Sequence, residues 1–115
     1  MKNLQLESLI KDLKKKSIDE KVAIWKRIAT DLEKPSRQRR IVNLSKLSKN
    51  VNEGDVVIVP GKILGDGDID KKITIAAFQF SDSAKEKLIG TKSTMLEIAD
   101  LMSKNPKGQK VKIIG

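Results

Sequence analysis

Val56-Val57-Ile58-Val59, followed by Pro60-Gly61, is the stretch of this sequence that decides the fold. A strand with one face in solvent alternates apolar and polar residues, whereas a strand covered on both faces is apolar throughout. The Pro-Gly pair predicts that the strand stops at its end. We therefore expect a buried strand with other elements packed against both of its faces.

The first third of the chain predicts two amphipathic helices. Between residues 6 and 13, apolar residues recur at i, i+3, i+4 and i+7. Residues Ser17 to Glu20 have the form of a capping box, which predicts that the second helix starts there. Trp25 lies on the apolar stripe of that helix, so we expect it in the core or at an interface and not stacked on a base. Pro35 should end the helix, because the residue before a proline is disfavoured in the α region.

Farther along, strands and helices should alternate. Residues 40–44 predict a short strand, and residues 72–80 predict a strand whose apolar parity changes midway, which indicates a bulge near Ala76-Ala77. Capping-box patterns at Ser83 to Glu86 and at Thr94 to Glu97 predict two further helices. After a turn at residues 105–108, residues 111–114 predict a terminal strand.

These elements predict an α/β fold. With 115 residues the chain is long enough for one domain with a modest core. We expect a single compact mixed domain over residues 1–115 that opens with a pair of helices. Residues 1–34 form its helical N-terminal part, residues 35–52 a basic segment, and residues 53–115 a core of strands and helices.

The composition excludes several classes of function. The chain has no cysteine and no histidine, so it lacks thiolate chemistry, the usual neutral-pH proton shuttle and the commonest zinc ligands. No apolar stretch approaches the roughly 18 residues of a membrane span, and the N-terminus lacks the apolar core of a signal peptide. We expect a protein of the cell interior with no catalytic residue, cofactor, metal or small-molecule substrate.

The formal net charge of +9 predicts a polyanionic partner. The charge is most concentrated between Lys34 and Asn52, where there is no carboxylate and where three of the four arginines fall within four residues. Clustered guanidinium groups suit the phosphates of a folded RNA. We expect this segment to be disordered alone and to order on binding. The candidate RNA-binding residues are Lys34, Arg37, Arg39, Arg40, Lys46, Lys49 and Lys62.

Three other motifs are weaker. Asp66-Gly67-Asp68 resembles the start of a calcium loop, but the later glycine and glutamate are missing, so a solvated turn is the better interpretation. Pro60-Gly61-Lys62 lacks the rest of a phosphate loop. It leaves two interpretations open: Gly61 adopts a positive φ after a strand, or Lys62 sits on a tight turn where it meets a phosphate. Phe78 and Phe80 could stack bases, although core packing is favoured.

Alternative functions remain open on the residues alone. An RNA-modifying enzyme could bind magnesium through Asp66 and Asp68, and would turn over RNA when purified. A free-standing nucleic-acid chaperone or DNA-coating protein would bind duplex DNA as well as ribosomal RNA. A membrane-surface role is disfavoured, because the stripe of the first helix is narrow and nothing else would anchor the chain.

Three blocks of the sequence, in order, resemble the large-subunit ribosomal protein eighteen-e family, which is related in fold to bacterial ribosomal protein fifteen. The blocks are residues 34–47, which contain Pro-Ser-Arg-Gln-Arg-Arg; residues 57–67, which contain Val-Pro-Gly-Lys; and residues 75–85. The chain departs from the family pattern at Ile89-Gly90-Thr91-Lys92, where a Gly-Gly pair is expected. The short length is similar to that of archaeal members.

The resemblance implies a domain of irregular β-β-α units behind an N-terminal helical extension. It also implies a structural, non-catalytic role in the large ribosomal subunit, bound to its RNA beside neighbouring large-subunit proteins in the cytoplasm. Under this hypothesis Arg37, Arg39 and Arg40 carry most of the RNA contact. We expect their replacement by glutamine to weaken incorporation into the subunit with little loss of thermal stability.

Overall fold

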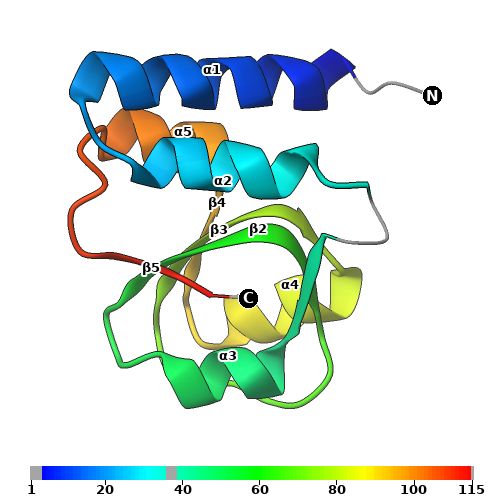
Figure 1. Ribbon diagram of the computed structural model, residues 1–115. Helices are drawn as coiled ribbons and strands as arrows, with labels where there is room; N and C mark the ends of the chain where they lie inside the picture. The colour runs from blue at the N-terminus through cyan, green and yellow to red at the C-terminus, as the bar shows by residue number, and fades with distance from the viewer. Residues whose placement is uncertain (1–3, 36–38, 115) are drawn as a thin grey trace.

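A parallel β-sheet separates two groups of helices in this protein (Figure 1). The computed structural model describes residues 4–35 and 39–114. Its elements in chain order are α1 (Leu4–Glu20), α2 (Ile24–Glu33), β1 (Arg40–Asn43), α3 (Leu44–Asn50), β2 (Val56–Leu64), β3 (Thr74–Phe80), α4 (Asp82–Gly90), β4 (Thr94–Glu97), α5 (Ile98–Lys104) and β5 (Val111–Ile113). The predicted α/β class is confirmed.

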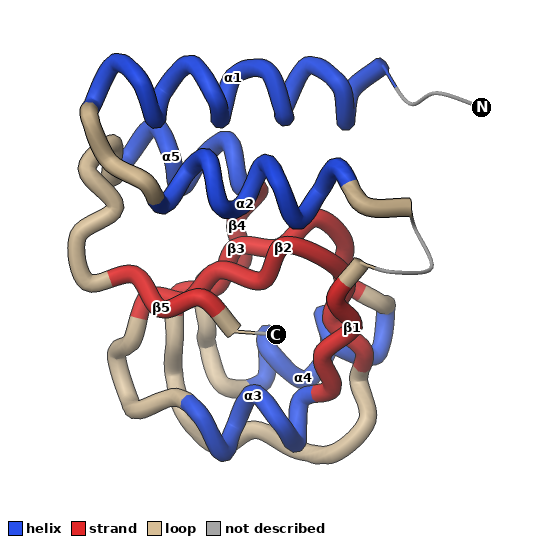
Figure 2. The backbone as a smooth tube through the Cα atoms, in the orientation of Figure 1, coloured by secondary structure: helices blue, strands red, loops and turns tan. Residues whose placement is uncertain are grey.

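The sheet is built around β2 (Figure 2). Its strands follow the order β1-β2-β3-β4, and every pairing is parallel. One edge of β2 pairs with β3. The other edge is shared, since residues 56–58 pair with β5 and residues 61–64 pair with β1. Along this edge of β2, β5 therefore pairs with the amino-terminal half and β1 with the carboxyl-terminal half.

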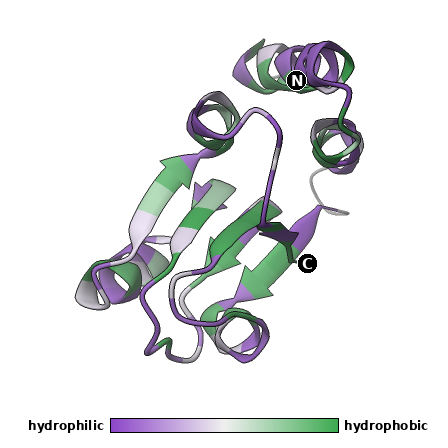
Figure 3. Cartoon of the chain, turned by 90° about the vertical axis from the view of Figure 1, so that its left-hand side faces the viewer, coloured by the Kyte–Doolittle hydropathy of each residue, from purple (hydrophilic) through white to green (hydrophobic). Residues whose placement is uncertain are grey.

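Both faces of the sheet are covered, as the continuous apolar run predicted. Val57 and Val59 belong to a buried cluster that includes Leu47 of α3 and Leu88 of α4. The side chain of Ile58 lies in the other cluster, which is formed with α1, α2 and α5. The hydropathy colouring shows the apolar strands between the two helical groups (Figure 3). Burial on both faces makes this strand the centre of the hydrophobic core.

The predicted stop at Pro60-Gly61 is wrong, because β2 continues to Leu64. Gly61 does not have a positive φ. Its role is close approach: a Cβ at this position would lie 2.0 Å from the main-chain oxygen of Arg40 on the adjacent strand. A bulge does lie next to Ala77, as predicted, but the extra residue is in β2, since the pairing shifts between Val59 and Lys62. Two β2 residues thus oppose one residue of β3.

Several helix boundaries differ from the prediction. α1 runs through Ser17, whose buried hydroxyl donates to the Val22 carbonyl, so the first capping box is wrong. Thr94 to Glu97 forms β4 instead of a helical start, and parallel pairing with β3 supplies its hydrogen bonds. The cap of α4 is Ser81, whose Oγ accepts from the Ala84 amide at 3.2 Å. The helix end before Pro35, the turn at residues 105–108 and the terminal strand are confirmed.

Candidate nucleic-acid interface

The predicted RNA-binding residues surround β1, at one edge of the sheet. Lys34 follows α2, Arg39 precedes β1 and Arg40 begins it, and the next two lysines lie on α3. Arg37 lies outside the described residues. Because α2 and α3 cover opposite faces of the sheet, these cations do not form one cluster. They form a band that crosses the edge from one face to the other.

A buried carboxylate holds the start of this band. Asp31, with only 7% of its surface exposed, lies in the last turn of α2. Its Oδ1 is 3.3 Å from the Lys34 ammonium, and its Oδ2 is 3.4 Å from Arg40 Nε. A buried carboxylate needs such partners, because burying an unpaired charge is costly. Asp31 therefore fixes β1 to α2 and neutralises part of the positive charge predicted to meet phosphate.

Arg39 is held at the end of the same helix. Its Nε donates to the main-chain oxygens of Leu32 at 3.2 Å and Lys34 at 3.1 Å, two carbonyls that the helix itself leaves unpaired. The guanidinium carbon lies 5.7 Å from the centre of the Phe78 ring, within cation–π range. Arg39 thus has a structural role, and only one of its five N–H groups, that of Nε, takes part in these two hydrogen bonds.

Lys46 and Lys49 are the least encumbered of the predicted residues. They lie three residues apart on α3, which places them on neighbouring positions of one helix face, and both are exposed. Neither forms an ion pair with a described carboxylate. The opposite face buries Leu44 and Leu47. The expected disorder of the basic segment is therefore wrong for its described residues beyond Arg39, which form a strand and a helix.

Lys62 lies on β2 beside β1, not on a tight turn. It is exposed and pairs in register with Ile41 on one side and Gln79 on the other. Next to it a groove of about 610 Å³ runs over β3 and β4; its lining includes Lys62, Phe78, Phe80, Lys85, Glu97 and Asp100. The two phenylalanines are half-buried and pack against the core clusters, as expected, with their remaining surface in this groove.

The loop that resembled a calcium site is occupied by an ammonium group. Lys87 Nζ donates to the carbonyls of Gly65 at 2.7 Å and Gly67 at 2.6 Å, and lies 3.7 Å from Asp68. A side-chain cation thus takes the place that a metal would have against these oxygens. Within the described residues no group of three or more carboxylates is placed to hold a metal ion. In the same part of the chain no helix has the length and apolarity needed to cross a membrane.

Sequence reasoning missed two features of this site. One is α3, although its spacing of Leu44, Leu47 and Val51 at i, i+3 and i+7 was a readable signal. The other is the contact of Asp31 with Arg40, which no spacing rule predicts because it depends on how α2 meets β1.

Two kinds of comparison with known proteins give matches over most of this chain. Residues 4–91 match the model of the family described as ribosomal proteins 50S-L15 and 50S-L18e, together with a 60S-subunit member. Among curated proteins, the chain is 42% identical to "Large ribosomal subunit protein eL18" of Methanococcus maripaludis over 97% of this chain and 93% of that protein. The protein of the same name from Pyrobaculum aerophilum is 43% identical over 97% of this chain and 92% of the relative.

A third relative of that name, from Methanothermobacter thermautotrophicus, is 39% identical over the same 97% of this chain. The family match spans the elements that carry the cationic band, from α1 to α4. The chain therefore belongs to the family of ribosomal proteins 50S-L15 and 50S-L18e.

Proposed function

We propose that this protein is a structural constituent of the large ribosomal subunit that binds and stabilises folded ribosomal RNA. Family membership supports the role, and the observation that carries the RNA contact is the cationic band around β1. In that band Lys46, Lys49 and Lys62 are exposed and without a carboxylate partner among the described residues. The protein acts in the cytoplasm, without catalysis, as part of the ribosome and beside other large-subunit proteins.

The band binds phosphate by releasing the counterions that surround RNA. Lys34, Arg39 and Arg40 lie on one side of the β1 edge and the α3 lysines on the other, so an RNA backbone can follow the band over the edge. Arg37 adds a further guanidinium. Four phosphate contacts would give a slope of about −3 to −4 for log K against log salt. Binding through the backbone needs no base-specific contact, which suits a chain with few aromatic residues.

The experiment compares two charge-matched double variants. Lys46→Gln with Lys49→Gln removes two open cations of the band, whereas Lys72→Gln with Lys92→Gln removes two exposed lysines elsewhere. Binding of each purified protein to large-subunit ribosomal RNA is measured at several salt concentrations. We expect the α3 variant to bind about tenfold more weakly at 0.15 M salt, with a slope smaller by about 1.5. Equal binding by both variants would remove α3 from the interface.

Arginine variants answer a different question. Arg40 pairs with the buried Asp31, and Arg39 binds the end of α2, so their replacement perturbs folding together with binding. Replacement of Arg37, Arg39 and Arg40 by glutamine was expected to cost little thermal stability; with these contacts, a loss of stability is expected from Arg39 and Arg40. Arg40→Gln leaves Asp31 with a single cation and should lower the free energy of unfolding by about 1–3 kcal/mol.

A further inference from the structure

We infer that the protein has a second RNA-binding surface, at the corner where the α1–α2 turn meets the loop between α5 and β5. We call it the lysine corner and define it by Lys21 and Lys110. This inference rests on the proposed function and adds a second point of contact with the same class of partner, the phosphate backbone of folded ribosomal RNA. It makes the protein a bridge between two RNA segments.

The loop of the lysine corner is fixed in place by three contacts. The Trp25 indole N–H donates to the main-chain oxygen of Pro106 at 2.7 Å. Lys107 Nζ lies 3.1 Å from the Glu20 carboxylate at the end of α1. Gly108, at φ +64°, approaches so closely that an added Cβ would lie 2.6 Å from the Ile24 side chain. These contacts hold residues 106–108 against both helices, and Lys110 lies two residues farther along the chain.

The two defining lysines share an unusual backbone conformation. Lys21 has φ +56° and Lys110 has φ +58°, and Lys92 is the third non-glycine residue with positive φ in the described chain. This region is normally occupied by glycine or by asparagine and aspartate, whose side chains bond locally. Lysine makes no such local bond at any of the three positions, so charge and position must distinguish Lys21 and Lys110 from Lys92.

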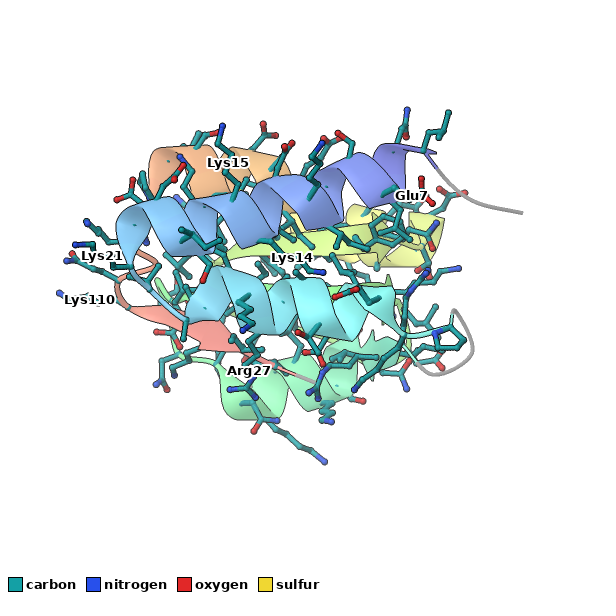
Figure 4. All side chains as sticks on the ribbon, turned by 45° about the horizontal axis from the view of Figure 1, so that its top comes forward. Glu7, Lys14, Lys15, Lys21, Arg27 and Lys110 are labelled. Atoms are coloured by element: carbon teal, nitrogen blue, oxygen red, sulfur yellow. The ribbon has the colours of Figure 1, made fainter. Side chains whose placement is uncertain are left out.

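Charge and position then identify the occupant. Lys21 and Lys110 extend from the same end of the molecule in Figure 4. Both are exposed, and neither pairs with a described carboxylate. Lys104, the last residue of α5, precedes the loop, whereas the nearby Glu20 is already engaged by Lys107 and Asp19 is the other acid of that turn. The net positive charge of the corner suits an anionic backbone.

The corner is distinct from the band around β1. α2 lies between them, with its first residue next to the corner and its last beside Lys34. At 1.5 Å per residue this helix alone separates the two surfaces by roughly 15 Å. That distance exceeds the spacing of adjacent phosphates, so no single phosphate can contact both surfaces. The protein would thus hold two separate groups of phosphates at a fixed spacing.

The test uses the full chain and hydroxyl-radical footprinting of large-subunit ribosomal RNA. Lys21→Gln with Lys110→Gln is compared with Lys72→Gln with Lys92→Gln; the control also contains one lysine of positive φ, so it matches charge and part of the backbone strain. We expect the native protein to protect two RNA segments. The corner variant should lose one of them, keep the other, and bind about tenfold more weakly with a salt slope smaller by about 1.5.

Each other outcome is decisive. If the corner variant keeps both protected segments and native affinity, the inference is wrong while the proposed function stands. If it binds naked RNA normally but enters subunits poorly, the corner contacts a neighbouring protein and the RNA inference is likewise wrong. If the control variant loses as much affinity as the corner variant, the effect is one of total charge and the inference fails. If the native protein protects no RNA, the proposed function falls too.

Discussion

Single residues divide the cations of this chain into two kinds. Some hold the fold: Arg40 pairs with buried Asp31, Lys87 binds loop carbonyls, and Lys71 donates to the carbonyls of Ser48 and Val51 at the end of α3. Others, such as Lys46, are exposed and without a carboxylate partner among the described residues. The formal net charge therefore overstates the charge available to a partner, and only the second kind is suited to testing RNA binding.

Two hydrogen bonds favour the ionised form of the Asp55 carboxylate. It accepts from Lys112 Nζ at 2.8 Å and from the main-chain N–H of Asn52 at 2.7 Å. The hydrogen bond from Lys112, followed by that from Asn52, lowers the pKa of Asp55 below its ordinary value. These contacts join β5 to the loop that precedes β2.

The lowered pKa makes a prediction about acid stability. Because the folded-state pKa lies below the unfolded value of about 3.9, the ionised carboxylate stabilises the fold fully above pH ~4. That contribution is lost as the pH falls through the folded-state pKa. Asp55→Asn should therefore lower the free energy of unfolding at pH 7 and approach the native protein in strong acid. Urea unfolding at pH 7 and pH 3 measures it; a gap that widens on acidification would contradict the assignment.

At the scale of elements, the position of β1 depends on the absence of a side chain at Gly61. The main chain of Arg40 approaches Gly61 so closely that no Cβ fits between them. This contact brings the start of the basic band against the sheet. A substitution in the middle of β2 should therefore change the position of β1.

Gly61→Ala tests this dependence. The new Cβ would meet main-chain atoms, which cannot rotate away, so we expect the free energy of unfolding to fall by about 1–3 kcal/mol. Gly90→Ala is the matched control, because no atom lies within 4 Å of a Cβ added there and its φ is not positive. In a helix the change from glycine to alanine should add up to about 1 kcal/mol. Thermal unfolding of both variants measures these changes in stability. A Gly61→Ala protein as stable as the native protein would rule out close packing of β1.

The elements also show how far sequence reasoning reaches. The apolar run of β2 correctly predicted a strand covered on both faces, and Pro35 correctly marked the end of α2. Three capping-box patterns misplaced their helices, because the hydroxyl of Ser17 bonds within the turn, Ser81 caps α4, and Thr94 joins a ladder with β3. Local patterns do not encode which strand a segment will meet. For the same reason the basic residues could be named in advance, but their contact with Asp31 could not.

Across the whole molecule, positive charge lies at both ends of α2 and around the β1 edge. A net charge of +9 on 115 residues repels itself when no RNA is present. Salt screens this repulsion over a Debye length of about 10 Å at 0.1 M. The same screening weakens attraction to phosphate. Folding and binding should therefore respond to salt in opposite directions.

This opposition can be measured on one protein preparation. Between about 0.05 and 0.5 M KCl we expect the Tm of the free protein to rise by a few degrees. Over the same range the affinity for ribosomal RNA should fall by about a thousandfold or more. Scanning calorimetry and a filter-binding titration supply the two curves. A Tm that drops with added KCl would show that ion pairs such as Lys112–Asp55 outweigh the overall repulsion.

The sole tryptophan of the chain has a practical use that follows from its hydrogen bond to Pro106. With no tyrosine present, fluorescence excited near the red edge of indole absorption comes from one buried ring. Its emission colour reports on the polarity around that ring. Detachment of the loop that carries Lys110 would expose the Trp25 ring to solvent and shift its emission to longer wavelengths. The fluorescence of Trp25 therefore reports whether the lysine corner is assembled.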